Sequence, residues 1–248
     1  MTRERLDRLM AMRGLAESRE QAQRLIRAGL VRAGGHRMTK PGHTVDESTV
    51  IALEQRPRFV SRGGEKLEVA FRTFGLHVEG LACLDVGAST GGFTDCLLQH
   101  GAGSVTAVDV GRGQIAWRLR RDDRVVLRER LNARYLTAAD LPQPPGFAAV
   151  DVSFISLTKI LPAVTQVLSA GAHMVTLIKP QFEAERSQVE RGGVVRRPEV
   201  RAAAAEKVRR FGTGELGLNW IEACDCPVRG PAGNIEILAH WRKANVDR

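Results

Sequence analysis

The chain has 248 residues and a formal net charge of +9, from 37 basic and 28 acidic side chains. This length allows a large domain with a small partner, and a hydrophobic fraction of 43% is sufficient for a sizeable core. A basic balance favours a polyanionic partner such as nucleic acid or an anionic membrane. The four cysteines form no C-x-x-C pair and the N-terminus has no apolar signal segment, so we expect a reduced, cytoplasmic protein.

Residues 1–55 are predicted to form a small, separate α+β domain. In the first 60 positions there are 12 basic and 7 acidic side chains, a net charge of +5. An apolar stripe over 6–10 predicts one helix. Ser18 followed by Gln21 is a capping-box signature for a second helix, which Gly29 would end. Short strands are expected near residue 31 and between residues 49 and 53.

This first unit resembles the S-four-type RNA-binding domain. The resemblance is carried by Arg5-Leu6-Asp7, Ser18-Arg19 through Ile26, Gly29-Leu30-Val31 and Lys40-Pro41-Gly42. It implies that basic side chains face the phosphates of structured RNA. The RNA-binding candidates are Arg5, Arg19, Arg24, Arg27 and Lys40. The alternative is a small basic domain whose charges are merely solvated.

Residues 56–60 contain a proline between two arginines and are predicted to be a linker to a second domain, 61–248. In that domain, strand-like and helix-like segments alternate, which is typical of a mainly parallel sheet with helices on both faces. We expect strands at 81–86, 104–110, 125–128, 147–152, 173–178, 219–225 and 235–241. We expect helices at 66–74, 92–99, 113–120, 156–168 and 199–211. The uncharged window 160–178 contains a proline and a turn, so we predict no membrane span there.

The stretch 81–95, LACLDVGASTGGFTD, predicts a buried strand, a glycine-rich turn and a helix start. Its glycines would let the backbone approach a ligand closely, and the helix start offers free N–H groups. The turn is neither a P-loop nor a dinucleotide fingerprint. Asp109, at the end of the next strand, could accept hydrogen bonds from ribose hydroxyls. This order of glycines and acids looks like the S-adenosylmethionine site of class I methyltransferases.

Polar side chains also stand at the ends of later strands. Asp151 and Lys179 each follow an apolar strand and should emerge at the same sheet edge as the glycine turn. Glu236 lies near the start of the last strand, which reaches that edge if the strand is antiparallel. Lys66 precedes the sheet and could fold over it. We therefore expect these four side chains to meet.

The four positions match the Lys-Asp-Lys-Glu tetrad of FtsJ-type ribose 2′-O-methyltransferases, and nearly the whole chain resembles the TlyA family. The wider resemblance is carried by Ser61-Arg62-Gly63-Gly64 with Lys66-Leu67, Gly87 to Phe93, Asp151 to Leu157, Lys179 to Glu183, and Gly233-Asn234-Ile235-Glu236. It implies a Rossmann-like class I methyltransferase domain with a mainly parallel seven-stranded sheet and an antiparallel last strand. The implied reaction transfers a methyl group from S-adenosylmethionine to a ribose 2′-hydroxyl of ribosomal RNA, at a cytidine.

The resemblance also implies the roles of individual residues. The catalytic candidates are Lys66, Asp151, Lys179 and Glu236. The cofactor-binding candidates are Asp85, Gly87, Ala88, Ser89, Thr90, Gly91, Gly92, Phe93, Asp109 and Asn132. Lys179 would contact the 2′-oxygen, either as a base or as an electrostatic stabiliser of the forming oxyanion.

The expected partner is ribosomal RNA or a ribosomal subunit, with neither a metal nor a membrane. Two alternatives stay open at this point. One is a membrane-active haemolysin, because relatives of this kind are often labelled so. The other is an RNA-binding protein with an inactive methyltransferase core.

Overall fold

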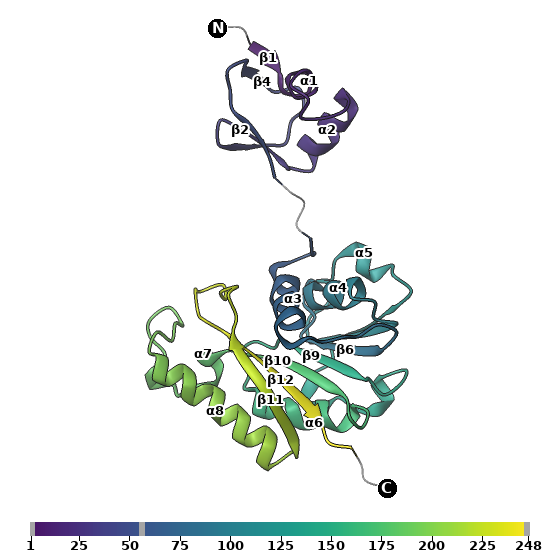
Figure 1. Ribbon diagram of the computed structural model, residues 1–248, viewed down its shortest axis with the longest axis vertical. Coiled ribbons are helices and arrows are strands. Elements are labelled where there is room, and N and C mark those ends of the chain that lie inside the picture. The colour runs from purple at the N-terminus through teal and green to yellow at the C-terminus, as the bar shows by residue number, and fades with distance from the viewer. Residues whose placement is uncertain (1–2, 55–57, 246–248) are drawn as a thin grey trace. The chain divides into compact units, whose positions relative to one another are not determined.

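The computed structural model describes residues 3–54 and 58–245, and the chain divides into two compact units between residues 58 and 59 (Figure 1). The first unit combines helices with two small antiparallel sheets. Its helices are α1 (Leu6–Met12) and α2 (Arg19–Arg27). Strand β1 (Arg3–Arg5) pairs with β4 (Thr44–Asp46), and β2 (Val31–Ala33) pairs with β3 (His36–Met38) and β5 (Ile51–Leu53). The unit is α+β as predicted, although β1 and β4 lie outside the predicted strands.

The apolar stripe predicted for the first helix is buried in this unit. Leu6, Leu9 and Met10 are each at most 4% exposed and pack in one cluster with Ile26 of α2. Gly29 follows the end of α2 with a φ of +68°, a conformation that glycine adopts without steric cost. The contacts between the two helices therefore give this small unit a core of its own.

The start of α2 differs in one detail from the predicted capping box. The Ser18 hydroxyl accepts a hydrogen bond from the Gln21 N–H at 3.2 Å, as an N-cap serine should. The Gln21 side chain accepts instead from the N–H of Glu17, one residue before the cap. Only half of the reciprocal capping box therefore forms.

The predicted linker, 56–60, is described only in part, because residues 56 and 57 lie outside the described residues. Phe59 is 4% exposed and belongs to a core cluster of the second unit. It packs on Gly64, where any Cβ would collide with the phenyl ring. Packing of the second unit thus begins at Phe59.

A seven-stranded sheet forms the centre of the second unit, in the order β11-β12-β10-β9-β6-β7-β8. The strands are β6 (Ala82–Val86), β7 (Ser104–Asp109), β8 (Val125–Glu129), β9 (Phe147–Val150), β10 (His173–Ile178), β11 (Leu218–Asp225) and β12 (Ile237–Lys243). Pairs within β10-β9-β6-β7-β8 are parallel, whereas β12 runs antiparallel to both of its neighbours. The predicted sheet and its antiparallel last strand are confirmed.

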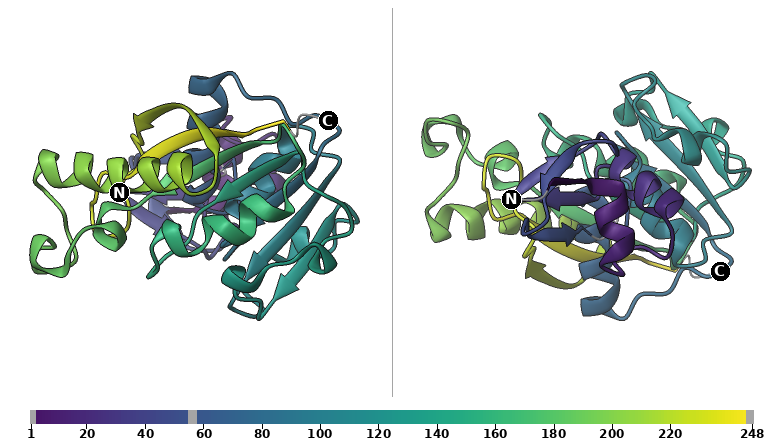
Figure 2. Two further views of the ribbon diagram at one scale, coloured as in Figure 1. Left: turned by 90° about the horizontal axis from the view of Figure 1, so that it is seen from below. Right: turned by 90° about the horizontal axis from the view of Figure 1, so that it is seen from above.

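Helices cover both faces of this sheet (Figures 1 and 2). They are α3 (Arg62–Phe74), α4 (Gly92–Gln99), α5 (Trp117–Arg120), α6 (Leu161–Val167), α7 (Pro180–Glu183) and α8 (Pro198–Gly214). Short 3-10 turns occur at Ala133–Tyr135, Ala138–Asp140, Leu157–Lys159 and Arg186–Gln188. The described part of the chain has no helix that is both long and apolar enough to cross a membrane.

Two predicted helices are shorter than expected. The first four residues of the predicted helix 113–120 are not helical, because Gly113 has a φ of +70° and the Ala116 N–H bonds the Thr90 carbonyl in the glycine turn. The predicted helix 156–168 is split into a 3-10 turn and α6. Pro162 stands in the first turn of α6, where the missing N–H costs no helical hydrogen bond.

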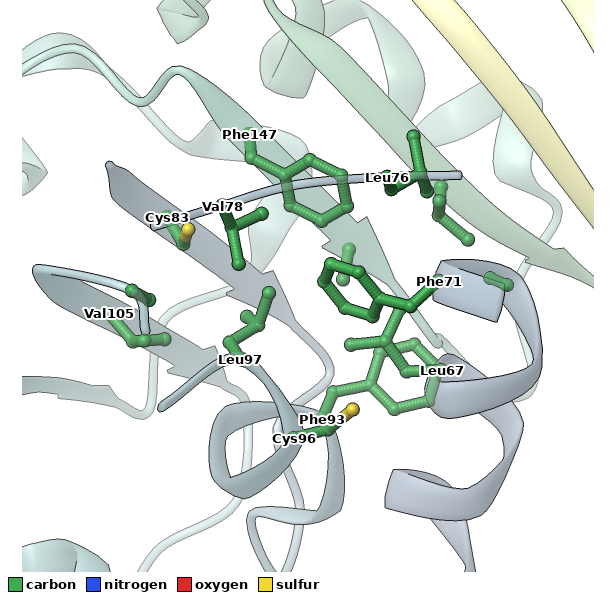
Figure 3. Packing of buried hydrophobic residues seen from close by; sticks show 14 of the residues in the cluster. Leu67, Phe71, Leu76, Val78, Cys83, Phe93, Cys96, Leu97, Val105 and Phe147 are labelled. Atoms are coloured by element: carbon green, nitrogen blue, oxygen red, sulfur yellow. The ribbon is translucent and has the colours of Figure 1, made fainter. Parts of the chain in front are cut away.

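The sheet is packed against a separate apolar layer on each face. Figure 3 shows the layer under α3 and α4, where Leu67 and Phe71 meet Phe93, Leu97 and Phe147. The opposite layer lies under α6 and α8 and contains Leu161, Val164, Met174, Val208 and Trp241. Strands buried on both faces read as continuous apolar runs, so polar residues can follow only where a strand ends.

Candidate active site

The glycine turn between β6 and α4 is shaped by close packing of its backbone. Gly87 has a φ of +87°, and a Cβ there would collide with the carbonyl oxygen of Asp151. At Gly91, with a φ of +95°, a Cβ would strike the Leu119 side chain, and Gly92 packs on Ser61. These positions thus require glycine because of neighbouring protein atoms, whatever ligand the turn also contacts.

A cavity of about 460 Å³ opens beside this turn, at the carboxyl ends of the parallel strands. We call it the first cavity. Gly87, Ser89, Asp109 and Asn132 line it among the predicted cofactor residues. Its apolar lining consists of Val108, Val110, Leu131, Ala133, Val152, Phe154, Ile155 and Ile160. The cavity therefore combines an apolar slot with a few polar groups, as small-molecule sites do.

Asp109 holds the two chain segments that flank the first cavity. One carboxylate oxygen accepts the Ser89 N–H at 2.8 Å, and the other accepts the Gly111 N–H at 2.6 Å. The Asn132 side chain accepts the Arg134 N–H at 3.1 Å and caps a 3-10 turn. Both predicted residues thus have structural hydrogen bonds in addition to their place in the cavity wall.

A second cavity, of about 430 Å³, contains the two predicted lysines. Lys66 and Lys179 line it, together with Ala88, Thr90, Gly92 and Phe93 of the predicted cofactor set. Gly87, Ser89, Asp151 and Ser153 line both cavities, so the two spaces share a wall. A ligand in the first cavity could therefore present one end to the second.

The four predicted catalytic residues come together as two ion pairs. Lys179 Nζ lies 2.6 Å from Asp151 Oδ1, and Lys66 Nζ lies 2.6 Å from Glu236 Oε2. The topology explains this meeting, because Ile178 pairs with Ile237 and thereby places Lys179 and Glu236 just beyond adjacent strand ends. The structure thus gives each lysine its own carboxylate rather than grouping three residues around Lys179.

Some predicted site residues stand behind the cavities instead of lining them. Gly91 packs on helix α5, and Glu236 reaches the second cavity only through Lys66. Asp85 is fully buried and accepts a hydrogen bond from the Thr94 hydroxyl at 2.6 Å. Burial raises the pKa of Asp85 to about 7, and the charges of Asp151 and Asp109 act in the same direction against the Thr94 hydrogen bond.

Ser153 and Glu183 were not among the predicted site residues. Ser153 Oγ accepts a hydrogen bond from Lys179 Nζ at 2.8 Å. Glu183, 4% exposed, accepts from the Leu157 N–H at 2.6 Å and from the Ser156 hydroxyl, and so holds the loop after β9. Both occur in the stretches that carry the family resemblance, but a serine or glutamate in a loop has no distinctive spacing that would single it out.

In the first unit, two of the predicted RNA-binding arginines also have a structural role. Arg5 and Arg19 both bind the buried carboxylate of Asp7, at 2.9 and 3.0 Å. The Arg5 hydrogen bond is the largest influence that holds the pKa of Asp7 well below its usual range. Arg24, Arg27 and Lys40 are exposed. The unit therefore presents free basic side chains beside arginines that are partly neutralised.

One group in the described residues has ligand types that metals use. Glu68, Cys96 and His100 offer atoms within 4.8 Å of one another where α3 meets α4. His100 Nε2 lies 2.7 Å from the Glu68 carboxylate and its ring stacks on Phe71. An ion pair between two helices accounts for this contact, and the prediction that the protein uses no metal stays a prediction.

Comparison with known proteins agrees with this geometry. Residues 59–243 match the FtsJ-like methyltransferase family, and residues 4–51 match the S4 domain. The 16S/23S rRNA (cytidine-2′-O)-methyltransferase TlyA of Mycobacterium tuberculosis is 44% identical, over 99% of this chain and 92% of that protein. YqxC of Bacillus subtilis (strain 168), by name a candidate rRNA methyltransferase, is 47% identical over 96% of this chain and 85% of its own length.

A solved structure agrees in fold as well as in sequence. A candidate hemolysin from Streptococcus thermophilus superposes with a TM-score of 0.75 at 46% identity, covering 98% of this chain and 90% of that one. The fold and the paired cavities define a Rossmann-like methyltransferase. This chain belongs to the FtsJ-like methyltransferase family and is an S4-domain member similar to the TlyA proteins.

Proposed function

We propose that this protein transfers the methyl group of S-adenosylmethionine to a ribose 2′-hydroxyl of ribosomal RNA, at a cytidine. The observation that carries the proposal is the second cavity, in which Lys179 and Lys66 are each fixed by a carboxylate and which shares a wall with the first. The printed name of the Mycobacterium tuberculosis relative supports the reaction, the RNA class and the base.

The first cavity suits the cofactor. A carboxylate offers about four lone-pair sites, so Asp109 retains acceptor capacity for ribose hydroxyls beyond its two backbone hydrogen bonds. Leu131, Ile155 and their apolar neighbours suit a planar base, and Asn132 provides a polar edge beside them. When bound, the cofactor supplies a methyl group that its positively charged sulfur has already activated.

In the second cavity, Lys179 is the residue that contacts the reacting oxygen. As the new C–O bond forms and the S–C bond breaks, the 2′-hydroxyl loses its proton and negative charge develops on the oxygen. An ammonium group fixed by Asp151 and Ser153 stabilises that charge, provided that it is aligned before the reaction. Lys66 adds a second positive charge to the same cavity, and the buried Glu236 positions it.

The S4 domain provides RNA affinity in this proposal. Its exposed Arg24, Arg27 and Lys40 suit the phosphate backbone of folded RNA, because such contacts depend on charge and shape more than on sequence. The reaction and the affinity then reside in different units of the chain.

The test is methyl transfer from S-adenosylmethionine into ribosomal RNA by the wild-type protein and by Lys179→Ala. We expect a loss of at least about a thousandfold in kcat, with cofactor binding retained in calorimetry. Lys159→Ala, which removes an equally charged but exposed lysine outside both cavities, is the matched control and should be fully active. Unchanged methylation by Lys179→Ala would overturn the proposed role.

The same preparation separates the alternative functions. A wild-type protein that binds rRNA but shows no heat of S-adenosylmethionine binding would be an RNA-binding protein with an inactive core. Release of dye from anionic vesicles by the purified protein, without rRNA methylation, would instead support membrane activity.

A further inference from the structure

A third cavity, of about 380 Å³, is lined by three arginines, and none of the roles above uses it. We call it the arginine pocket. Its basic walls are Arg196, Arg201 and Arg229, and its remaining walls are Val194, Val195, Ala232, Gly233 and Ile235. The arginines come from the segment before α8, from the first turns of α8 and from the loop before β12. Such convergence from separate segments is a property of the tertiary structure.

The arginine pocket adjoins the second cavity. Pro231 lines the second cavity, and the next residue, Ala232, lines the arginine pocket. Ile235 lines the pocket, while its neighbour Glu236 binds Lys66. One short loop before β12 therefore separates the two spaces.

Asn234 fixes this arrangement. It is 2% exposed, its side-chain oxygen accepts the Val195 N–H at 2.8 Å, and its side-chain nitrogen donates to the Gly193 carbonyl at 2.8 Å. Figure 1 shows the two loops side by side, above the start of α8. The amide thus ties the segment before α8 to the loop before β12, and the pocket is formed without a ligand.

The charges of the pocket suit an anion. Arg201 donates to the Arg196 carbonyl at 2.7 Å and Arg229 to the Gly233 carbonyl at 3.2 Å; among the described residues, neither forms an ion pair with a carboxylate. Arg196 pairs with Glu190 at 3.0 Å, on the exposed surface. Each guanidinium has five N–H donors, so Arg201 and Arg229 retain donors in the fork geometry that matches phosphate oxygens.

We propose that the arginine pocket binds a backbone phosphate of the RNA strand that carries the target ribose. The inference rests on the proposed function and extends it from one ribose to the neighbouring nucleotides. A strand with its reacting ribose in the second cavity continues over the adjoining surface, and every following nucleotide carries a phosphate. The pocket lies across one loop and holds two positive charges that no carboxylate neutralises.

The test compares two double variants of equal charge. Arg201→Gln/Arg229→Gln removes the two free guanidinium groups of the pocket. Arg209→Gln/Arg210→Gln removes two arginines from the same helix that pair with Glu206 and lie outside the pocket. The measurements are binding of isolated ribosomal subunits over a range of salt concentrations, rRNA methylation kinetics, and calorimetric binding of S-adenosylmethionine.

For the pocket variant we expect roughly tenfold weaker RNA binding, a plot of log K against log salt that is shallower by about 1.4, a higher KM for RNA, and unchanged kcat and cofactor affinity. The helix control should behave as wild type. Arg201→Lys/Arg229→Lys keeps both charges and should keep the salt slope.

A pocket variant that matches the helix control overturns the inference, and so does a lysine variant that loses as much slope as the glutamine variant, because the loss would then be structural. A wild-type protein that fails to methylate rRNA overturns the proposed function itself, and is thereby distinct from failure of the pocket.

Discussion

Two lysine–carboxylate pairs of the same length meet different environments in this active site. Lys66 and Glu236 are sealed from solvent, with side chains 9% and 1% exposed, and Lys66 has its carboxylate as partner. Lys179 and Asp151 are 10% and 19% exposed, and Lys179 has Ser153 as a further partner. The sealed pair is part of the fold, whereas the open pair faces both cavities. Equal distance therefore does not imply equal function.

Breaking the sealed pair should have the largest effect on stability. Glu236→Ala leaves the Lys66 ammonium buried without its carboxylate, so we expect a loss of about 3–5 kcal/mol in the free energy of unfolding. Lys66→Met/Glu236→Met removes both charges and should recover most of that loss, but not the methyl transfer. Urea unfolding of the three proteins measures this. A single variant as stable as wild type would show that the pair is not structural.

Asp85 sharpens the comparison, because it is a fully buried carboxylate that pairs with no lysine among the described residues. Its pKa of about 7 lies above the ordinary 3.8, so its protonated form stabilises the fold below about pH 4 and this contribution is lost as the pH rises towards 7. At about 1.4 kcal/mol per pKa unit, stability relative to Asp85→Asn should fall by up to about 4 kcal/mol.

The measurement is the free energy of unfolding of wild type and Asp85→Asn between pH 4.5 and about 8. Their difference should change through this window and level off above pH 7. A difference that is flat across the whole window would mean that burial does not raise the pKa of Asp85.

The open pair should show the reverse balance between activity and stability. Asp151→Asn leaves Lys179 next to a neutral amide at a partly exposed site, so we expect about 1 kcal/mol or less in stability. Loss of alignment should lower kcat roughly a hundredfold. The ratio of activity loss to stability loss, compared with Glu236→Ala, checks the contrast directly. Equal ratios in the two variants would abolish it.

Ser153 should have the smallest effect. Ser153→Ala removes one of the two groups that hold Lys179, so we expect roughly a tenfold fall in kcat with little change in stability. Ser153→Thr retains a hydroxyl and should recover part of the rate. Pre-steady-state methyl transfer at saturating RNA and cofactor separates this effect from binding, and an unchanged rate would exclude a positioning role for the hydroxyl.

Much of the fold follows from local pattern. Continuous apolar runs end at Asp109, Asp151 and Lys179, because strands buried on both faces cannot hold unpaired charges. The helix α4 begins and ends where its pattern predicts. The helix before β8 is shorter than its pattern predicts because Ala116 bonds the glycine turn, a contact between segments far apart in sequence.

The sequence by itself determined the two-domain order, the alternation of strands and helices, and the four residues that meet at one sheet edge. Only the tertiary structure decided that Lys66 pairs with Glu236 and Lys179 with Asp151, that Ser153 and Glu183 support the site, and that Arg196, Arg201 and Arg229 share a cavity. The physical reason is that periodicity reports burial along one segment, whereas ion pairs and cavities depend on which segments the sheet brings together.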